Sequence, residues 1–374
     1  MENPFKFLFK KQDASVVGID IGSSSIKVVQ LKRKAGRAIL ETYGALSLGP
    51  YGGLETGRAT KLPEDKIIEA LGDILREANT TTKQCGMALP FRSSLISVIE
   101  LPTQSMKQYS QMVPIEARKY IPVPISEVTL DWSIIPKEQS APDEVNPMET
   151  NLSQAGTVAK SDVLVVAIHN DTINTYKDII DAVKLDVGFF EVELFSTMRS
   201  VLDQEVQPIM IFDMGAASTK LYIVERGIVR VSYTINRGSQ DITLAISQSL
   251  GVSVDRAESI KRSVGLMSAK PEENIKEIAG LVLEYIFSEA NRVLLNYERR
   301  YNKNVKKVFL VGGGSALKGF SEVARVAFET DVYLGNPFGK VQTPAFLEEI
   351  LKNTGPEFTV AVGVALRRLQ ELEG

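Results

Sequence analysis

Two segments far apart in the chain share one pattern. Residues 16–31 read VVGIDIGSSSIKVVQL, and residues 209–224 read IMIFDMGAASTKLYIV. Each is an apolar run rich in β-branched residues, a short polar turn with glycine, and a second such run, which predicts a β-hairpin. Aligned without gaps, the two segments share four residues: Asp20 with Asp213, Gly22 with Gly215, Ser25 with Ser218, and Lys27 with Lys220. One such hairpin is common, but two in register indicate an internal repeat.

The repeat extends beyond the hairpins. Each hairpin is followed by a second glycine turn, at Gly36 and Gly227, and by a third predicted strand, over residues 38–48 and 228–235. Two three-stranded units of this kind, one opening each half of the chain, predict a duplicated α/β domain with a cleft between the copies.

A nucleotide in the cleft would explain why each first strand ends with an aspartate. A nucleoside triphosphate brings several negative charges and Mg²⁺, and Mg²⁺ keeps waters that Asp20 and Asp213 can hold. The turn residues can present backbone N–H groups to phosphate oxygens, and Lys27 can neutralise phosphate charge. Taken alone, either hairpin is explained as well by a β-turn whose aspartate caps the chain.

Two further segments fit a nucleotide cleft. Residues 308–315, VFLVGGGS, predict a strand and three glycines before a helical stretch from Leu317, an arrangement that lets backbone approach a ligand closely. The spacing is not GxGxxG, which disfavours a dinucleotide-binding fingerprint. Residues 253–265 predict a helix with Glu258 and Lys261 on one face, which could hold ribose hydroxyls and an adenine edge, or form a surface ion pair.

Composition excludes several other kinds of site. The formal net charge is −3, whereas nucleic-acid binders are usually strongly basic, so we expect the basic run of residues 299–307 to be a solvated loop. The single cysteine, Cys85, excludes an internal disulfide and a multi-cysteine zinc site. The single histidine, His169, disfavours a histidine metal site or a Ser-His-Asp triad, and we expect it to be structural. With no apolar run of about 18 residues and no secretory pattern, we expect a cytosolic protein.

Together these segments resemble the actin-like ATPase superfamily, which includes actin, DnaK-type chaperones, sugar kinases and FtsA. The DIGSSSIK and DMGAAST hairpins look like its two phosphate loops, and LVGGGSAL looks like its adenosine motif. Over nearly the whole chain the sequence more closely resembles the PilM family of type IV pilus assembly, through the first hairpin and residues 116–124 (EARKYIPVP) and 238–252 (GSQDITLAISQSLGV). The resemblance implies an α/β actin-like fold, with duplicated ribonuclease-H-like halves around a nucleotide cleft and an FtsA-like inserted α+β subdomain.

The resemblance and the element pattern divide the chain into four parts. These are a first half of residues 13–84 and 186–205, closed by a C-terminal helix at about 358–373; an inserted subdomain of residues 85–185; a second half of residues 206–232 and 306–357; and a helical subdomain of residues 233–305. In the helical subdomain, apolar residues at helical spacing predict a core-facing stripe: Ile275, Ile278, Val282, Ile286, Ala290, Val293, Leu294 and Tyr297.

The inserted subdomain has a β-β-α-β-β-α pattern. The stretches cover residues 86–90, 95–101, 106–120, 128–135, 163–169 and 172–183. Pro114 lies inside the first helical stretch and predicts a kink or two short helices. Residues 137–162, rich in Ser, Pro, Glu and Asn, predict a mobile hairpin loop.

By the same resemblance the cofactors are ATP and Mg²⁺, with the metal held through water by Asp20 and Asp213. The residues expected around the nucleotide are Asp20, Gly22, Ser23, Ser24, Ser25 and Lys27 from the first half, Asp213, Gly215, Ala216, Ala217 and Ser218 from the second, and Glu258, Lys261, Gly312, Gly313, Gly314 and Ser315. Glu193, at the end of a predicted strand over residues 189–193, resembles the position from which the superfamily orients the attacking water, so the resemblance makes it the expected catalytic residue. A carboxylate there could align or deprotonate that water. Many relatives have glycine where this chain has Ala216 and Ala217, so we expect weak or no ATPase activity.

The leading hypothesis is an ATP-binding scaffold at the cytoplasmic face of the inner membrane. The resemblance implies two partners: a PilN-like inner-membrane protein, whose N-terminal peptide would enter a groove between residues 85–185 and the first half, and the pilus assembly ATPase machinery. We expect no nucleic-acid partner and only indirect membrane contact, with residues 1–12 a frayed terminus rather than an anchor. Two alternatives stay open, a sugar kinase of the same superfamily and an FtsA-like filament protein that tethers to membrane.

Overall fold

A computed structural model describes residues 14–135, 160–267 and 275–372 of the chain. These residues separate into two compact units, a smaller one from Phe91 to Asn174 and a larger one formed by the chain before and after it. The predicted frayed terminus, residues 1–12, and most of the loop predicted over residues 137–162 lie outside the described residues.

The larger unit contains two five-stranded sheets with the same topology. Their strand orders are β3-β2-β1-β4-β8 and β11-β10-β9-β12-β13. In each sheet the first three strands form an antiparallel meander and the last two join it in parallel. The strands are Ser15–Ile21 (β1), Ser25–Lys34 (β2), Arg37–Ser47 (β3), Gln84–Leu89 (β4), Asp186–Val192 (β8), Ile209–Met214 (β9), Thr219–Glu225 (β10), Ile228–Ile235 (β11), Lys307–Val311 (β12) and Asp331–Leu334 (β13). This equivalence confirms the duplication predicted from the repeat.

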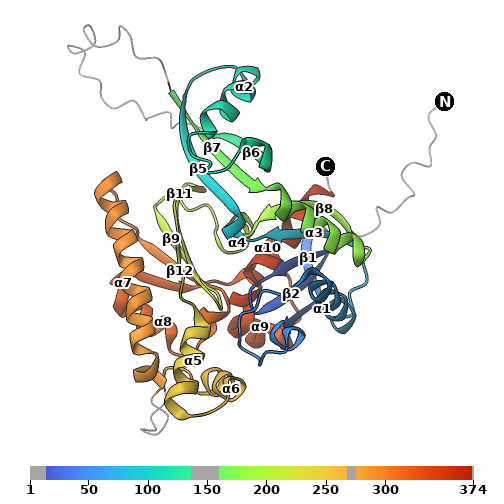
Figure 1. Ribbon diagram of the computed structural model, residues 1–374, viewed down its shortest axis with the longest axis vertical. Helices are drawn as coiled ribbons and strands as arrows, with labels where there is room; N and C mark the ends of the chain where they lie inside the picture. The colour runs from blue at the N-terminus through green and yellow to red at the C-terminus, as the bar shows by residue number, and fades with distance from the viewer. Residues whose placement is uncertain (1–13, 136–159, 268–274, 373–374) are drawn as a thin grey trace, which may run out of the picture. The chain divides into compact units, whose positions relative to one another are not determined.

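Helices cover both faces of the first sheet (Figure 1), because its central strands are apolar on both sides. Val17 and Ile19 of β1 pack with α1 (Glu64–Glu77) and α3 (Asn170–Ala182). Val16 points to the opposite face and packs with α10 (Thr359–Glu371), which also contacts α4 (Glu193–Val201). At Gly18 any side chain would collide with the Ala361 carbonyl of α10, so glycine lets this helix lie directly on β1.

The second sheet is covered by helices that place a cluster of aromatic rings on β9. The ring of Phe212 lies 5.6–6.0 Å, centroid to centroid, from those of Phe287, Phe320 and Phe328. Figure 1 shows α7 and α8, which supply these three rings, running alongside β9 and β12. The helices of this half are Ser239–Leu250 (α5), Val254–Val264 (α6), Ile275–Tyr301 (α7), Phe320–Phe328 (α8) and Glu348–Thr354 (α9).

The apolar stripe predicted on α7 is confirmed over most of its length. Six of the eight predicted positions are buried: Ile275, Ile286, Ala290, Val293, Leu294 and Tyr297. Near the start of the helix, Ala279 and Leu283 are buried instead of Ile278 and Val282, which are only partly covered. At 3.6 residues per turn the buried residues form one straight stripe along α7, and Ile278 and Val282 lie at its edge.

In its described residues the smaller unit forms a three-stranded antiparallel sheet with one helix packed on it. The sheet order is β5-β7-β6, with strands Ser94–Pro102 (β5), Val128–Ile135 (β6) and Lys160–His169 (β7), and the helix is Met106–Ala117 (α2). These elements follow the predicted pattern, although β7 begins three residues before the predicted strand. Within the predicted insertion of residues 85–185, β4 and the end of α3 belong to the larger unit.

Pro114 lies inside α2, which remains a single helix, so the alternative of two short helices is wrong. Tyr109 and Val113 precede the proline and Ala117 follows it, and all three are buried in the same apolar cluster. Packing against one sheet face holds the two turns together despite the lost backbone hydrogen bond.

Candidate functional site

A cavity of about 450 Å³ in the larger unit is lined by residues of both halves. Nearly all of the predicted site residues line it: Asp20, Gly22, Ser23, Ser24, Ser25, Lys27, Glu193, Asp213, Gly215, Ala216, Ser218, Glu258, Lys261, Gly312, Gly313 and Gly314. The lining does not include Ala217 or Ser315, although both are described. Ser315 is buried, and its hydroxyl donates to the Val311 carbonyl at 2.6 Å. Five segments that are far apart in sequence therefore meet around one cavity.

The two hairpin turns at this cavity have the same internal geometry. In the first, the Gly22 N–H donates to the Ser25 carbonyl oxygen at 3.0 Å, and in the second the Gly215 N–H donates to the Ser218 carbonyl oxygen, also at 3.0 Å. Tight turns of this kind leave other backbone N–H groups directed away from the hairpin, where they can bind an anion.

The aspartates and lysines of the repeat are also placed alike. Asp20 stands opposite Lys27 in the β1–β2 ladder, and Asp213 stands opposite Lys220 in the β9–β10 ladder. Lysine Nζ to aspartate Oδ2 measures 3.5 Å in the first pair and 3.4 Å in the second. Each half therefore contributes one acid and one base to the cavity from equivalent positions.

Lys220 lines the cavity but was not among the predicted site residues. Its Nζ donates to Glu193 Oε2 at 2.7 Å as well as approaching Asp213. The alignment of the two repeats matches Lys27 with Lys220, so Lys220 could have been predicted from the repeat. Glu193 is the first residue of α4 rather than the end of a strand, because β8 stops at Val192.

Burial sets the electrostatics of the acidic residues. It raises the pKa of Asp20 above its usual range, and the nearby Lys27 opposes that rise. It likewise raises the pKa of Asp213, with Lys220 opposing. Burial alone would lower the pKa of Lys220, but Glu193 and Asp213 outweigh it, so that the pKa of Lys220 is raised. The carboxylates are thus costly to keep charged unless a cation stays beside them.

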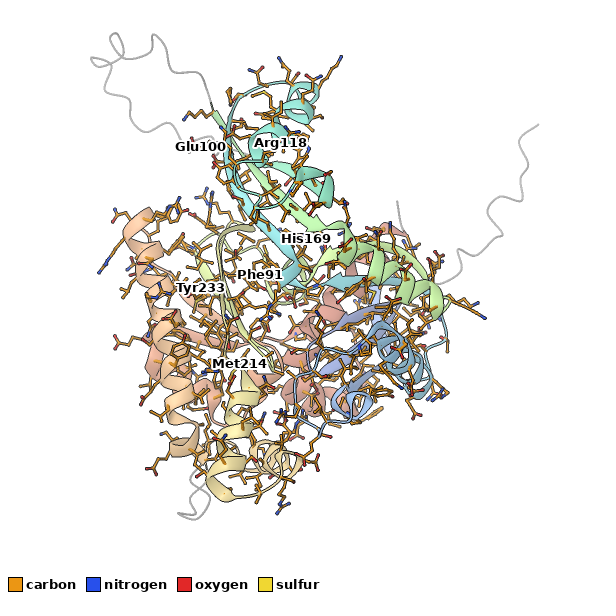
Figure 2. All side chains as sticks on the ribbon, viewed as in Figure 1. Phe91, Glu100, Arg118, His169, Met214 and Tyr233 are labelled. Carbon is orange, nitrogen blue, oxygen red and sulfur yellow. The ribbon has the colours of Figure 1, made fainter. Side chains whose placement is uncertain are left out.

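The glycine-rich segment after β12 packs against the second hairpin. Gly312 has φ +82°, and a side chain there would collide with the Asp213 carboxylate. A Cβ at Gly314 would lie 2.5 Å from Cγ of Met214, which is labelled in Figure 2. The helix predicted from Leu317 begins only at Phe320, because the segment first makes a short 3₁₀ turn over Gly313–Ala316. The glycines therefore allow this loop to lie directly on the acid of the second turn, rather than to start a helix there.

Glu258 and Lys261 form a buried cluster on α6, which excludes the surface ion pair considered above. Lys261 Nζ lies 2.7 Å from Glu258 Oε2, and the same oxygen accepts from the Thr243 hydroxyl at 2.7 Å. Glu258 Oε1 accepts from Arg262 at 2.8 Å. Although burial opposes it, these partners lower the pKa of Glu258 to about 2. The cluster presents a fixed carboxylate and a fixed ammonium to one end of the cavity.

A loop of the first half, residues 55–59, contacts α5 and α6 of the second half beside this cluster. Glu55 Oε2 accepts from the backbone N–H of Val254 at 2.7 Å, and Gln240 Oε1 accepts from the backbone N–H of Ala59 at 2.9 Å. A Cβ at Gly57, where φ is +89°, would lie 2.9 Å from Glu258 Cγ. No motif predicted this contact between the halves.

Glu357 is a further lining residue that the sequence reasoning missed. Burial raises its pKa, while Lys27 and Arg262 oppose the rise. It follows Pro356, whose carbonyl accepts from the Gly312 N–H at 2.9 Å. The cavity thus combines backbone donors, lysines and buried carboxylates, a set that can bind a ligand with phosphate groups at one end and hydroxyls at the other.

The sequence profile of the family described as type IV pilus assembly protein PilM matches residues 18–369. The cell division protein FtsA of Agrobacterium fabrum is 23% identical over 240 residues, which cover 58% of this chain and 53% of that protein. The alignment thus spans about half the length of this relative. FtsA of Neisseria meningitidis serogroup B is 22% identical over 98% of this chain and 92% of its own.

Solved structures identify the fold as actin-like. A PilM-PilN type IV pilus biogenesis complex has a TM-score of 0.77 and 24% identity, covering 95% of this chain and 98% of that one. MreB 5 of Spiroplasma citri bound to AMPPNP has a TM-score of 0.53 and 10% identity, covering 97% and 98%. No helix in the described residues has the length and apolar character needed to cross a membrane.

Proposed function

Because the chain belongs to the type IV pilus assembly protein PilM family, we propose that it is an ATP-binding scaffold of the pilus assembly platform, at the cytoplasmic face of the inner membrane. The observation that carries the proposal is the pair of equivalent turns, with Asp20–Lys27 on one side and Asp213–Lys220 on the other, lining one cavity. A ligand held by both turns stabilises one arrangement of the two halves, and so controls the surface that partners meet.

The nucleotide would be held by different residues at its two ends. Backbone N–H groups of residues 23–25 and 216–218, with Lys27, would bind the phosphates. Glu258 and Lys261 would face the ribose and base, because a fixed carboxylate accepts from hydroxyls and an ammonium donates to ring nitrogens. The solved MreB 5 structure contains AMPPNP on the same fold, which supports an adenine nucleotide here.

Mg²⁺ fits this cavity in a water-mediated mode. Within the part of the chain that the structure describes, no three His, Cys, Asp or Glu side chains are grouped to ligate a metal directly. Asp20 and Asp213 both line the cavity and each already contacts a lysine, so we propose that they would hold the metal through its waters. When bound, the metal would neutralise phosphate charge.

We propose that hydrolysis is weak or absent. A carboxylate that activates water must be able to accept its proton, whereas Glu193 Oε2 already accepts from Lys220 at 2.7 Å. Ala216 also lines the cavity and carries a methyl group at a turn position where glycine would allow closer backbone approach. Purified protein without partners should therefore release phosphate from ATP very slowly, and many turnovers per second would contradict the scaffold role.

We propose that the partner is a PilN-like membrane protein whose N-terminal peptide docks on the smaller unit, with the pilus assembly ATPase machinery as a further partner. Two observations support this proposal. The solved PilM-PilN complex pairs a protein of this family with PilN, and in the smaller unit β5 and β6 are the outer strands of the sheet. An outer strand can pair with an extended peptide, with main-chain hydrogen bonds for affinity and side-chain pockets for specificity. The partner's span would bring the chain to the membrane.

Two measurements test the proposal. Isothermal titration of ATP in the presence of Mg²⁺ should show binding to the full chain, and absence of binding would remove the nucleotide site. A labelled N-terminal peptide of the PilN-like protein should bind, with hydrogen–deuterium exchange slowed in β5 or β6. Slowed exchange confined to the larger unit would contradict the docking site, and no binding would remove the partner. Sugar-dependent ATP consumption would instead indicate a kinase, and ATP-dependent sedimenting polymer a filament protein.

A further inference from the structure

The proposed phosphate end of the cavity contains an ion-paired cluster of three carboxylates and two lysines: Asp20, Asp213, Glu193, Lys27 and Lys220. Lys27 contacts Asp20 alone among these acids, at 3.5 Å. Lys220 contacts both Asp213, at 3.4 Å, and Glu193, at 2.7 Å. The three acids together carry more negative charge than the two lysines neutralise, and each lysine lies at ion-pair distance from at least one of the acids.

Lys220 is held as a fixed cation in this cluster. Only 18% of its side chain is exposed, and it lies in the cavity lining between the two acids. Its Nζ contacts both Glu193 Oε2 and Asp213 Oδ2, and a lysine beside two acids is protonated at neutral pH. An ammonium in this position attracts phosphate oxygens and neutralises part of their charge beside Asp213.

We propose that Lys220 takes over part of the charge neutralisation that Mg²⁺ supplies, so that nucleotide binding to this protein depends little on Mg²⁺. The inference rests on the proposed nucleotide site. Removing Lys220 changes the sum of the five charges at the phosphate end from −1 to −2, because Asp20, Asp213 and Glu193 remain with Lys27 alone. A nucleotide without metal then meets greater repulsion, whereas one that brings Mg²⁺ meets little.

The test is the ratio of the dissociation constants of AMPPNP measured in excess EDTA and in excess Mg²⁺. Isothermal titration of the full wild-type chain should give a ratio below about fivefold. In Lys220→Met the ratio should rise by about tenfold, since one unit charge in a partly buried site changes affinity by that order. Circular dichroism and thermal melting check that the variant is folded.

Two further variants separate the charge effect from other causes. Lys318 also lines the cavity, but its Nζ donates to the Ser263 carbonyl at 2.8 Å. Lys318→Met removes one positive charge outside the carboxylate cluster, and its ratio should stay near that of the wild type. The double variant Lys220→Met/Glu193→Gln removes one positive and one negative charge, so its ratio should also return toward the wild-type value. The double variant also provides a test of the inference if Lys220→Met alone does not fold.

The outcomes distinguish this inference from the proposed function. A wild-type ratio as large as that of Lys220→Met, with binding intact in Mg²⁺, would overturn the role of Lys220 and leave the nucleotide site in place. A double variant that still needs Mg²⁺, or a Lys318→Met variant that gains the same need, would also overturn it. Absence of AMPPNP binding to the wild type under both conditions would remove the nucleotide site itself.

Discussion

The buried cluster on α6 allows a quantitative prediction about the nucleoside end of the cavity. Glu258 is only 5% exposed and accepts hydrogen bonds from Thr243 and Arg262, besides its ion pair with Lys261. We predict that Glu258→Gln destabilises the protein at neutral pH and that this loss becomes smaller in acid. The variant removes the negative charge of the carboxylate but keeps the size and shape of the side chain.

The size of the effect follows from the pKa of Glu258. Burial would raise this pKa, but Lys261, Thr243 and Arg262 together lower it from 4.5 to about 2. Because the pKa is lower in the folded state, the cluster stabilises the protein above about pH 4.5, and this contribution is lost as the pH falls toward 2. The shift corresponds to about 3 kcal/mol at neutral pH and to roughly half of that at pH 3. Burial lowers the pKa of Lys261, a cost on the lysine side that makes 3 kcal/mol an upper value.

Urea unfolding of wild type and variant, followed by circular dichroism at neutral pH and in acid, measures the difference directly. Glu258→Gln also leaves Lys261 buried without its carboxylate, which adds a loss of its own. The double variant Glu258→Gln/Lys261→Met removes both charges and should recover part of the stability, which isolates the pair. A loss that is the same at both pH values would refute the ionic explanation.

Four other substitutions test the cavity. Asp20→Ala and Asp213→Ala should each reduce the rise in melting temperature that Mg²⁺-ATP gives the wild type, because ligand binding stabilises only the folded form; equal rises in all three proteins would contradict the site. Gly312→Ala should lower the free energy of unfolding by about 1–3 kcal/mol, since φ is +82° and the new methyl collides with Asp213; an unchanged urea midpoint at an unchanged slope would show that the loop adapts without cost. Gly57→Ala should push the residue 55–59 loop away from Glu258 and speed the release of a fluorescent ATP analogue in stopped-flow measurements; an unchanged release rate would show that the loop does not cover the nucleotide.

The duplicated fold was predictable because its evidence is local. A hairpin is specified by residues that are neighbours in sequence, so the turns at Gly22 and Gly215 were visible as two copies of one pattern. The helix limits on α6 were equally local, with Ser253 accepting from the Arg256 N–H at its start and Gly265 ending it. Placing Glu258 and Lys261 on one face needed only helical spacing.

What the sequence did not predict depends on contacts between distant segments. The pairing of Glu55 with Val254 joins the two halves and has no pattern of its own along the chain. The three glycines after β12 predicted close backbone approach, but the partner in that approach, the Asp213 carboxylate, is set by the sheet order. Pro114 argued for a broken helix, and burial of the residues on both sides outweighed that local preference.

The site is asymmetric although the hairpins are copies, and this asymmetry decides its chemistry. Asp20 with Lys27 and Asp213 with Lys220 repeat one another in register and distance. The difference comes from the last strand of each sheet. Strand β8 is followed at once by Glu193, which reaches Lys220, whereas the equivalent strand β13 is followed by Gly335, which has no side chain to place there. One lysine therefore has a single acid to balance and the other has two. A duplicated domain can thus form a cavity from two equivalent turns and still hold the lysine of only one turn, Lys220, between two acids.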